Sequence, residues 1–238
     1  MEDSVSAIVL SKIRYKDNDA IVKLFTKEYG VISFIVKIGS RLKKSKSRLV
    51  YFQELTILEI QFNYNSKKEL QYIRDINLKY NYISCHSDIK KGSIIIFLSE
   101  VLSNILFHQK KDVALYNYIE ESLIWYDSNK GNPYFHLIFL VQLTKFLGFY
   151  PDEINNNFKY FNLEEGCYEL AKTSKYSISN ADLKLFNQIL GTKFDGNPLT
   201  LNTKELMNVL NIILTYYKLH TNNFKYIKSM EIINTIFN

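Results

Sequence analysis

The chain has 238 residues, of which 47% are hydrophobic and 15% aromatic, and this composition excludes an intrinsically disordered protein. No run reaches the roughly 18 apolar residues of a membrane helix, and the acidic start differs from a secretory signal, so we expect a soluble cytosolic protein without membrane contact. The net charge of +6 favours an anionic partner.

The first 80 residues have the pattern of a small β-barrel. Five short segments alternate in polarity or run apolar, as strands do: residues 4–14, 20–26, 31–38, 55–62 and 70–77. Gly30 lies in a hairpin turn, at a position that favours a positive φ. One long loop follows the third strand. Five strands with one long loop predict a barrel of the OB type, a fold that often binds single-stranded nucleic acid on one face.

The long loop is rich in positive charge. Residues 37–49 read KIGSRLKKSKSRL and contain no acidic residue. The cations in and beside this loop are the candidates for contact with a polyanion: Arg14, Lys37, Arg41, Lys43, Lys44, Lys46 and Arg48. Each lysine or arginine that meets a phosphate releases a condensed counterion, and this release favours binding. The alternative interpretation is a solvated linker that its charge keeps soluble.

The distribution of charged and aromatic residues favours binding over the linker. Residues 1–80 hold 15 lysines and arginines against nine acidic residues, whereas residues 81–238 hold 15 of each. Aromatic rings near the basic loop can stack on nucleic-acid bases, and the best candidates are Tyr51, Phe52 and Tyr15. We therefore expect one domain to bind a polyanion and the other to support it.

From about residue 81 the apolar residues follow a helical period. Six helices are predicted, over residues 88–108, 112–127, 132–148, 180–190, 202–220 and 229–237. Asn132 and Pro133 have the pattern of a cap and a first helical residue, Gly148 that of a helix end, and Asn202 with Glu205 that of a capping box. Residues 151–179 have no regular pattern. The sequence thus predicts an α+β multidomain protein: a five-stranded OB-type barrel in residues 1–80 and an all-α helical domain in residues 81–238.

Sequence motifs of catalysis are missing. The chain contains no P-loop, dinucleotide-binding, zinc-protease or nucleophile-elbow motif. His136 lies on the most apolar helix, where a core histidine is expected rather than a catalytic one. Cys85 and Cys167 lie far apart and indicate neither a disulfide framework nor a zinc site. We expect no catalytic residue, no metal and no cofactor; the enzyme alternative is a hydrolase with a carboxylate-bound metal.

Several short segments resemble the RecO family of bacterial recombination mediators. The resemblance begins at AIVLSKIRYKDNDAIVKLFTKEYG, residues 7–30, and continues through KSRL, residues 46–49, and QELTILE, residues 53–59. It resumes at FLGFYPD, residues 146–152, and covers most of the chain in order. The resemblance implies an N-terminal OB barrel followed by a helical domain, which agrees with the periodicity. Many family members have a cysteine zinc motif after the last segment; this chain has one cysteine there, Cys167, so we expect packing to replace the metal.

The resemblance implies a non-enzymatic DNA repair protein that acts in the cytoplasm, at the nucleoid. Such proteins bind single- and double-stranded DNA, anneal complementary strands and, with a RecR-type partner, help to load recombinase onto DNA coated by single-strand-binding protein. In the helical domain, five lysines are candidates for binding the acidic tail of that protein: Lys90, Lys91, Lys110, Lys111 and Lys145. Solvated helix ends are the alternative for these lysines. An OB-fold RNA-binding or ribosome-associated protein is the alternative for the whole chain.

Overall fold

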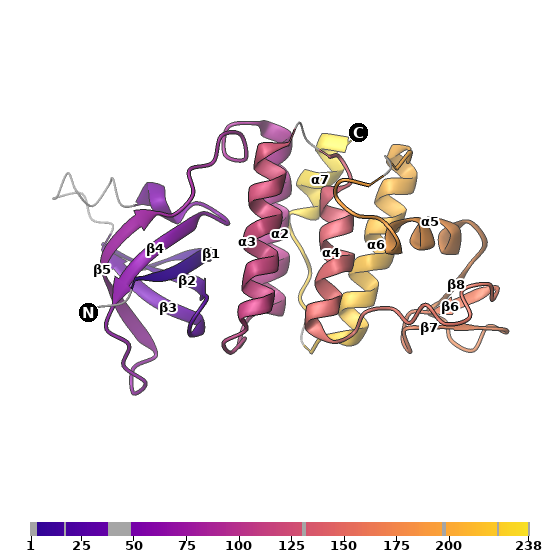
Figure 1. Ribbon diagram of the computed structural model, residues 1–238, viewed down its shortest axis with the longest axis horizontal. Helices are drawn as coiled ribbons and strands as arrows, with labels where there is room; N and C mark the ends of the chain where they lie inside the picture. Colours follow the sequence, from indigo (N-terminus) through magenta and orange to yellow (C-terminus); the bar gives the residue numbers. More distant parts are fainter. Residues whose placement is uncertain are drawn as a thin grey trace. The chain divides into compact units, whose positions relative to one another are not determined.

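A computed structural model of the chain describes residues 4–16, 18–37, 49–129, 132–196, 199–222 and 224–237 (Figure 1). The chain forms two compact units. The first consists of residues 1–130 and 227–233, and the second of residues 131–226 and 234–238. The domain boundary that the sequence predicts at residue 80 falls inside the first unit and stays a prediction.

Five strands of the first unit close into a barrel, as the sequence predicts, and their order is β1-β2-β3-β5-β4. Their bounds are β1 Val5–Lys16, β2 Asp19–Thr26, β3 Gly30–Lys37, β4 Ile57–Phe62 and β5 Leu70–Leu78, with the short 3₁₀ helix η1, Leu49–Phe52, before β4. Gly30 has the predicted positive φ, 75°, at the turn between β2 and β3. Strand β5 pairs in parallel with β3 over three residues and antiparallel with β4.

Alternate strand residues fill the barrel. The buried cluster takes side chains from all five strands: Val5, Ala7 and Val9 of β1, Val22 and Leu24 of β2, Ile32 and Phe34 of β3, Leu58 and Ile60 of β4, and Ile76 of β5. This spacing of two is the strand period that the sequence shows. Phe52 of η1 completes the cluster and is 2% exposed. The prediction that Phe52 stacks on a base is therefore wrong, because its ring is part of the barrel core.

Two helices of the first unit pack on the outside of the barrel: α2, Ile89–Ile105, and α3, Val113–Ser128 (Figure 1). The hydroxyl groups of Ser99 and Ser103 donate hydrogen bonds of 2.7 and 2.8 Å to the carbonyl oxygen of Leu10. The ring of Phe25 packs against that of Tyr116 at 5.6 Å. One side of the barrel is therefore covered by its own helices, which leaves other sides for ligands.

The second unit contains α4 Phe135–Leu147, α5 Asn180–Leu190 and α6 Thr203–His220, while α7, Met230–Phe237, contributes residues to both units. The six helices found in the described residues confirm the predicted set. Gly148 ends α4 with φ 82°, and Asn202 and Glu205 form the predicted capping box of α6. The predicted start of α4 is wrong: Asn132 accepts a hydrogen bond from the N–H of Tyr134 in a turn, and the helix begins at Phe135. No helix in the described ranges combines the length and apolarity needed to cross a membrane.

Residues 151–179 contain a small antiparallel sheet, where the sequence predicts an irregular segment. Strand β6, Tyr160–Asn162, pairs with β7, Cys167–Glu169, on one edge and with β8, Ser177–Ser179, on the other. The strands have three residues each, too few for an alternating pattern to be recognised. Phe161 of β6 is fully buried against Tyr168 and Phe186. Aromatic packing thus joins this sheet to α5.

Candidate nucleic-acid interface

The predicted DNA-binding residues lie at one end of the barrel, as far as the structure describes them. Arg14 is in the last third of β1, Lys37 ends β3 and Tyr51 is in η1. The remaining candidates, Arg41, Lys43, Lys44, Lys46 and Arg48, lie outside the described residues. The segment that carries them connects the end of β3 to the start of η1.

Strand pairing brings the described cations close to one another. Lys16 of β1 pairs with Asp19 of β2, and Asp19 pairs with Lys37 of β3. Arg14, two residues before Lys16 on β1, pairs with Ala20 of β2. Because paired residues in neighbouring strands lie about 5 Å apart, the three cations occupy one end of the sheet, with Asp19 between them. This end is where the basic segment of residues 38–48 begins.

Lys12 and Arg14 lie on the face of β1 that continues the inside of the barrel. Their partners on β2 are Val22 and Ala20, which are both buried. The ammonium group of Lys12 donates a 3.0 Å hydrogen bond to the carbonyl oxygen of Phe52. Arg14 is exposed, as Lys12 is. Its guanidinium group can therefore reach a phosphate at the mouth of the barrel.

The two predicted tyrosines differ in exposure. Tyr51 is half-buried and packs against the barrel core. Tyr15 is 49% exposed, and the ammonium group of Lys16 lies 5.3 Å from its ring centre. Tyr15 thus offers more free ring surface for a base than Tyr51 does.

Tyr72 and Arg74 of β5 belong to the aromatic and cationic N-terminal part of the sequence but are not among the predicted site residues. Tyr72 is 63% exposed and is paired with Ile35 of β3. The parallel pairing of β3 with β5 covers only Ser33–Ile35 and Leu70–Tyr72. Beyond it lies a hollow of 260 Å³, lined by residues that include Lys37, Phe52 and Tyr72. The strand period places residues 72 and 74 on one face, but only the burial of Gln71 shows that this face is the outer one.

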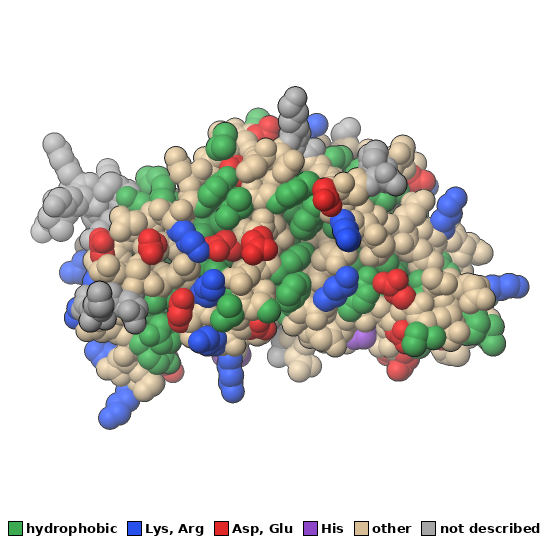
Figure 2. Space-filling model, in the orientation of Figure 1, with side chains coloured by type: hydrophobic (Ala, Val, Ile, Leu, Met, Phe, Trp, Pro, Cys, Tyr) green, Lys and Arg blue, Asp and Glu red, His purple; other side chains and the backbone are tan. Residues whose placement is uncertain are grey.

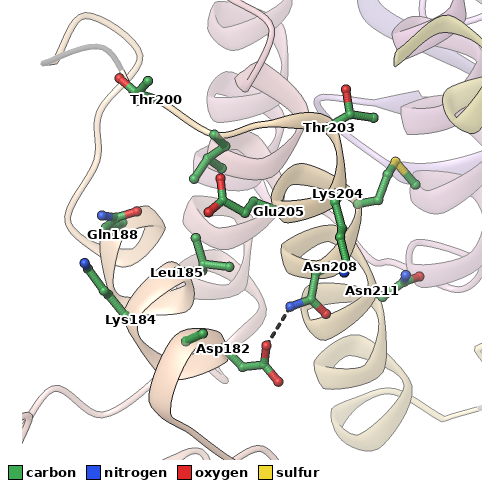
Figure 3. A pocket seen from close by; sticks show the side chains of 13 residues that line it. Asp182, Lys184, Leu185, Gln188, Thr200, Thr203, Lys204, Glu205, Asn208 and Asn211 are labelled. Carbon is green, nitrogen blue, oxygen red and sulfur yellow. Dashed lines mark hydrogen bonds between the residues drawn. The ribbon is translucent and has the colours of Figure 1, made fainter. Parts of the chain in front are cut away.

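Charges of both signs lie on the face drawn in Figure 2, where lysine and arginine side chains over the barrel, at left, alternate with acidic ones. The second unit has a mixed site as well. A hollow of 1100 Å³ between α5 and α6 is lined by Lys184 and Lys204 but also by Asp182 and Glu205 (Figure 3). The side-chain amide of Asn208 donates a 2.6 Å hydrogen bond to Asp182 at its edge. Equal numbers of both charges give this hollow little attraction for a polyanion.

The lysines considered for an acidic tail have different surroundings. Lys91 is buried, and its ammonium group donates to the carbonyl oxygens of Tyr126, Asp127 and Asn129 at the end of α3. The prediction that Lys91 is available to an acidic tail is therefore wrong. The other four are exposed: Lys90, Lys110, Lys111 and Lys145.

The described residues offer little for catalysis. His136 is buried in α4, its ring centre 5.5 Å from that of Phe237, and burial lowers its pKa to about 3. It is a neutral core residue at pH 7, as predicted. Burial also raises the pKa of both thiols, Cys85 and Cys167, so neither is an activated nucleophile. Within the described ranges, no group of three or more His, Cys, Asp or Glu side chains is arranged to hold a metal ion.

The chain is similar to known proteins over its whole length. Residues 1–82 match the family described as Recombination protein O N terminal, and residues 86–230 match Recombination protein O C terminal. A protein of Flavobacterium psychrophilum named DNA repair protein RecO is 35% identical over 238 residues, which cover 100% of both chains. Proteins of the same name from Flavobacterium johnsoniae and Christiangramia forsetii are 33% and 32% identical, over 100% and 97% of both chains.

Proposed function

The chain belongs to the recombination protein O (RecO) family of DNA repair proteins, and on this basis we propose that it is a strand-annealing recombination mediator. Membership gives the chain a role in DNA repair and recombination. The finer function proposed is binding of single- and double-stranded DNA, annealing of complementary strands, and assistance in loading recombinase onto DNA coated by single-strand-binding protein. A RecR-type protein is the proposed partner in loading.

The observation that carries the DNA-binding proposal is the convergence of cations at one end of the barrel. Arg14, Lys16 and Lys37 lie where β1 ends, β2 begins and β3 ends, and five further cations follow within residues 41–48. Phosphates of two strands repel each other, and a shared cationic surface reduces that repulsion. Annealing then needs no bond to be made or broken. Phosphate contacts position a strand without reading its bases, so sequence preference is expected to be weak.

Strand annealing under varied salt tests the proposal. Two complementary labelled oligonucleotides are mixed with the protein, without nucleotide or metal, and pairing is followed in time. We expect salt-sensitive acceleration that persists when the strands are first coated with single-strand-binding protein. Binding without annealing would reduce the chain to a general nucleic-acid binder, and no binding at low salt would contradict the proposal.

A variant with four substitutions tests whether the basic segment of residues 38–48 binds the DNA. Replacing Arg41, Lys43, Lys44 and Lys46 by alanine is expected to weaken DNA binding and to flatten its salt dependence by about 0.7 in log–log slope for each lost single-strand contact. A matched control replaces four exposed lysines outside the barrel: Lys90, Lys111, Lys172 and Lys204. This control has the same change in net charge. An equal loss in both variants would show that net charge, rather than the segment, drives binding.

Binding of RNA is the second candidate function, because an OB-type barrel with a basic loop can hold either nucleic acid. The 2′-hydroxyl distinguishes them. Affinities for RNA and DNA of one sequence, measured at the same salt concentration, separate the two. A clear preference for RNA would favour this second function.

Four exposed lysines, now without Lys91, are the proposed contact for an acidic protein tail: Lys90 of α2, Lys110 and Lys111 between α2 and α3, and Lys145 of α4. A tail peptide of single-strand-binding protein, immobilised on a resin, tests this proposal. Retention of the protein, and its loss when these lysines are replaced by alanine, would support the contact. No retention would contradict the contact and favour the alternative that these lysines are solvated helix ends.

A further inference from the structure

The turn between β4 and β5 forms a hollow of 630 Å³ on the outside of the barrel. Among the described residues that line it are three cations, Lys67, Lys68 and Arg74, and two tyrosines, Tyr64 and Tyr72. The rest of its lining is amide, hydroxyl and apolar, and includes no carboxylate. Glu69 and Asp75 are neighbours in the sequence but do not line the hollow. Its charge suits an anionic ligand, unlike the mixed hollow between α5 and α6.

One buried side chain fixes the backbone of the turn between β4 and β5 through hydrogen bonds. Gln71 of β5 is 3% exposed, and its amide oxygen accepts a 3.0 Å hydrogen bond from the N–H of Asn65. Its amide nitrogen donates to the carbonyl oxygens of Asn65 and Lys68, at 2.9 and 2.6 Å. Because the backbone that carries both lysines is fixed, a ligand does not have to order it on binding, and less binding free energy is lost.

Both tyrosines present ring surface to solvent. Tyr64 is 52% exposed and is stacked on Tyr29, with ring centres 4.9 Å apart and planes at 29°. This stacking fixes one face of the Tyr64 ring and leaves the other side open. Tyr72 is 63% exposed on the outer face of β5. An exposed ring of fixed orientation is the kind of platform on which an unpaired base stacks.

Tyr72 lies between the two hollows of the barrel. It lines the 630 Å³ hollow with Lys67 and Lys68. It also lines the 260 Å³ hollow, whose charged residues are Lys37, at which the basic segment begins, and Asp19. A ligand that touches Tyr72 can therefore reach cations on both sides of it. This continuity distinguishes the outer face of β5 from a single phosphate site.

We propose that one single strand of DNA lies along the outer face of β5, with bases stacked on Tyr72 and Tyr64 and phosphates at Lys67 and Lys68. The proposal rests on the DNA-binding function above and adds a site selective for unpaired nucleotides. In a duplex each base is stacked on its neighbours and has no free face, so the tyrosines contact unpaired bases only. The basic segment of residues 38–48 serves both forms of DNA, because both carry phosphates.

Binding of Tyr72→Ala to single- and double-stranded oligonucleotides, measured by fluorescence anisotropy at one salt concentration, tests the proposal. Stacking one base on an aromatic ring corresponds to about 5- to 150-fold in affinity. We expect a loss in this range for the single strand and about none for the duplex. Tyr72→Phe keeps the ring and should bind as the unmodified protein does. Tyr226→Ala removes a tyrosine that is 73% exposed in the second unit and should have no effect.

The lysines are tested separately through salt. In the double variant Lys67→Ala/Lys68→Ala, the log–log slope of single-strand affinity against salt should fall by about 1.4, or 0.7 for each lost contact. Photo-cross-linking with an iodouracil-substituted single strand, followed by peptide mapping, should label Tyr72 or Tyr64. Thermal unfolding of each variant checks that the barrel is intact.

The outcomes separate this site from the proposed function. If the unmodified protein binds single strands and the Tyr72→Ala and double lysine variants bind them equally well, the β5 site is overturned and the DNA-binding function stands. An equal loss for single strand and duplex in Tyr72→Ala would also overturn it, because stacking on unpaired bases would not explain such a loss. If the unmodified protein binds neither form of DNA, the proposed function itself fails.

Discussion

Lys91 and Asp127 meet at the end of α3, where the ammonium group of Lys91 donates a 2.9 Å hydrogen bond to the carbonyl oxygen of Asp127. The side-chain carboxylate of Asp127 accepts hydrogen bonds of 2.8 Å from the N–H groups of Ile83, Ser84 and Cys85. The cation stabilises the negative end of the α3 dipole, and the anion binds the segment between β5 and α2. Together they hold the connection between the barrel and its helices.

Replacing Asp127 by Asn should destabilise the first unit. The variant replaces the negative charge of the carboxylate, to which three N–H groups donate, by a neutral amide. Hydrogen bonds to a charged acceptor are stronger than those to a neutral one. We expect the free energy of unfolding to fall by about 2 kcal/mol, measured by urea denaturation. The control is Glu121→Gln, a loss of one exposed carboxylate on the same helix. Equal effects of both substitutions would contradict the role given to Asp127.

The same carboxylate predicts a dependence of stability on pH. Burial alone would raise the pKa of Asp127, but the N–H groups of Ile83, Ser84 and Cys85 and the Ser84 hydroxyl outweigh it and lower the pKa from 3.8 to about 2. A group whose pKa is lowered on folding stabilises the folded state above its unfolded pKa and loses this effect as pH falls through the folded pKa. The difference in unfolding free energy between the unmodified protein and Asp127→Asn should therefore be constant above about pH 5 and shrink between pH 4 and pH 2. A constant difference down to pH 2 would contradict the assignment.

Gly30→Ala should strongly destabilise the barrel. Gly30 has φ 75°, and an added Cβ would come within 3.0 Å of backbone atoms of Gln109 and Lys110. Both the conformation and the space therefore oppose a side chain, and we expect a loss of about 2 kcal/mol or more in thermal or urea unfolding. Gly191→Ala is the matched control, because its added Cβ meets nothing within 4 Å and its φ is −83°. The control should be neutral or slightly stabilising.

Glu169→Ala should loosen the small sheet of the second unit. The Glu169 carboxylate accepts hydrogen bonds from the Ser177 and Thr173 hydroxyls, the Thr173 N–H and the side-chain amide of Asn162. Burial raises its pKa, but these four donors outweigh burial and lower it. We expect faster amide hydrogen exchange and faster proteolysis in residues 160–179, with little change in the barrel. Glu165→Ala, which removes an exposed carboxylate from the same region, should leave both rates unchanged.

This network bears on the zinc motif that many RecO proteins have in the same region. The sequence predicts that packing alone takes over the stabilising role of the metal, but hydrogen bonds to Glu169 contribute as well. Phe161 supplies buried apolar contact, and Glu169 joins β7 to the start of β8 through hydrogen bonds. The absence of zinc itself stays a prediction, and metal analysis of the purified protein would test it.

Local patterns in the sequence determined the barrel strands and the helices, but not the three short strands β6, β7 and β8. The alternation of apolar residues gave the five strands, the helical period gave the six helices, and Asn202 with Glu205 marked the start of α6 correctly. The separation of charge gave the expectation of a cationic N-terminal part. These features depend on residues within a few positions of one another. They can therefore be recognised without knowing which distant segments pack together.

Tertiary structure decided which residues face solvent and which lie together. Phe52 and Lys91 look accessible in the sequence but are buried, one by the barrel core and the other by the end of α3. Tyr72 is exposed beside Lys37 because β5 pairs with β3, a pairing of residues more than 30 positions apart. Pairing and burial depend on which distant segments meet, and a periodic pattern in one segment does not contain that information.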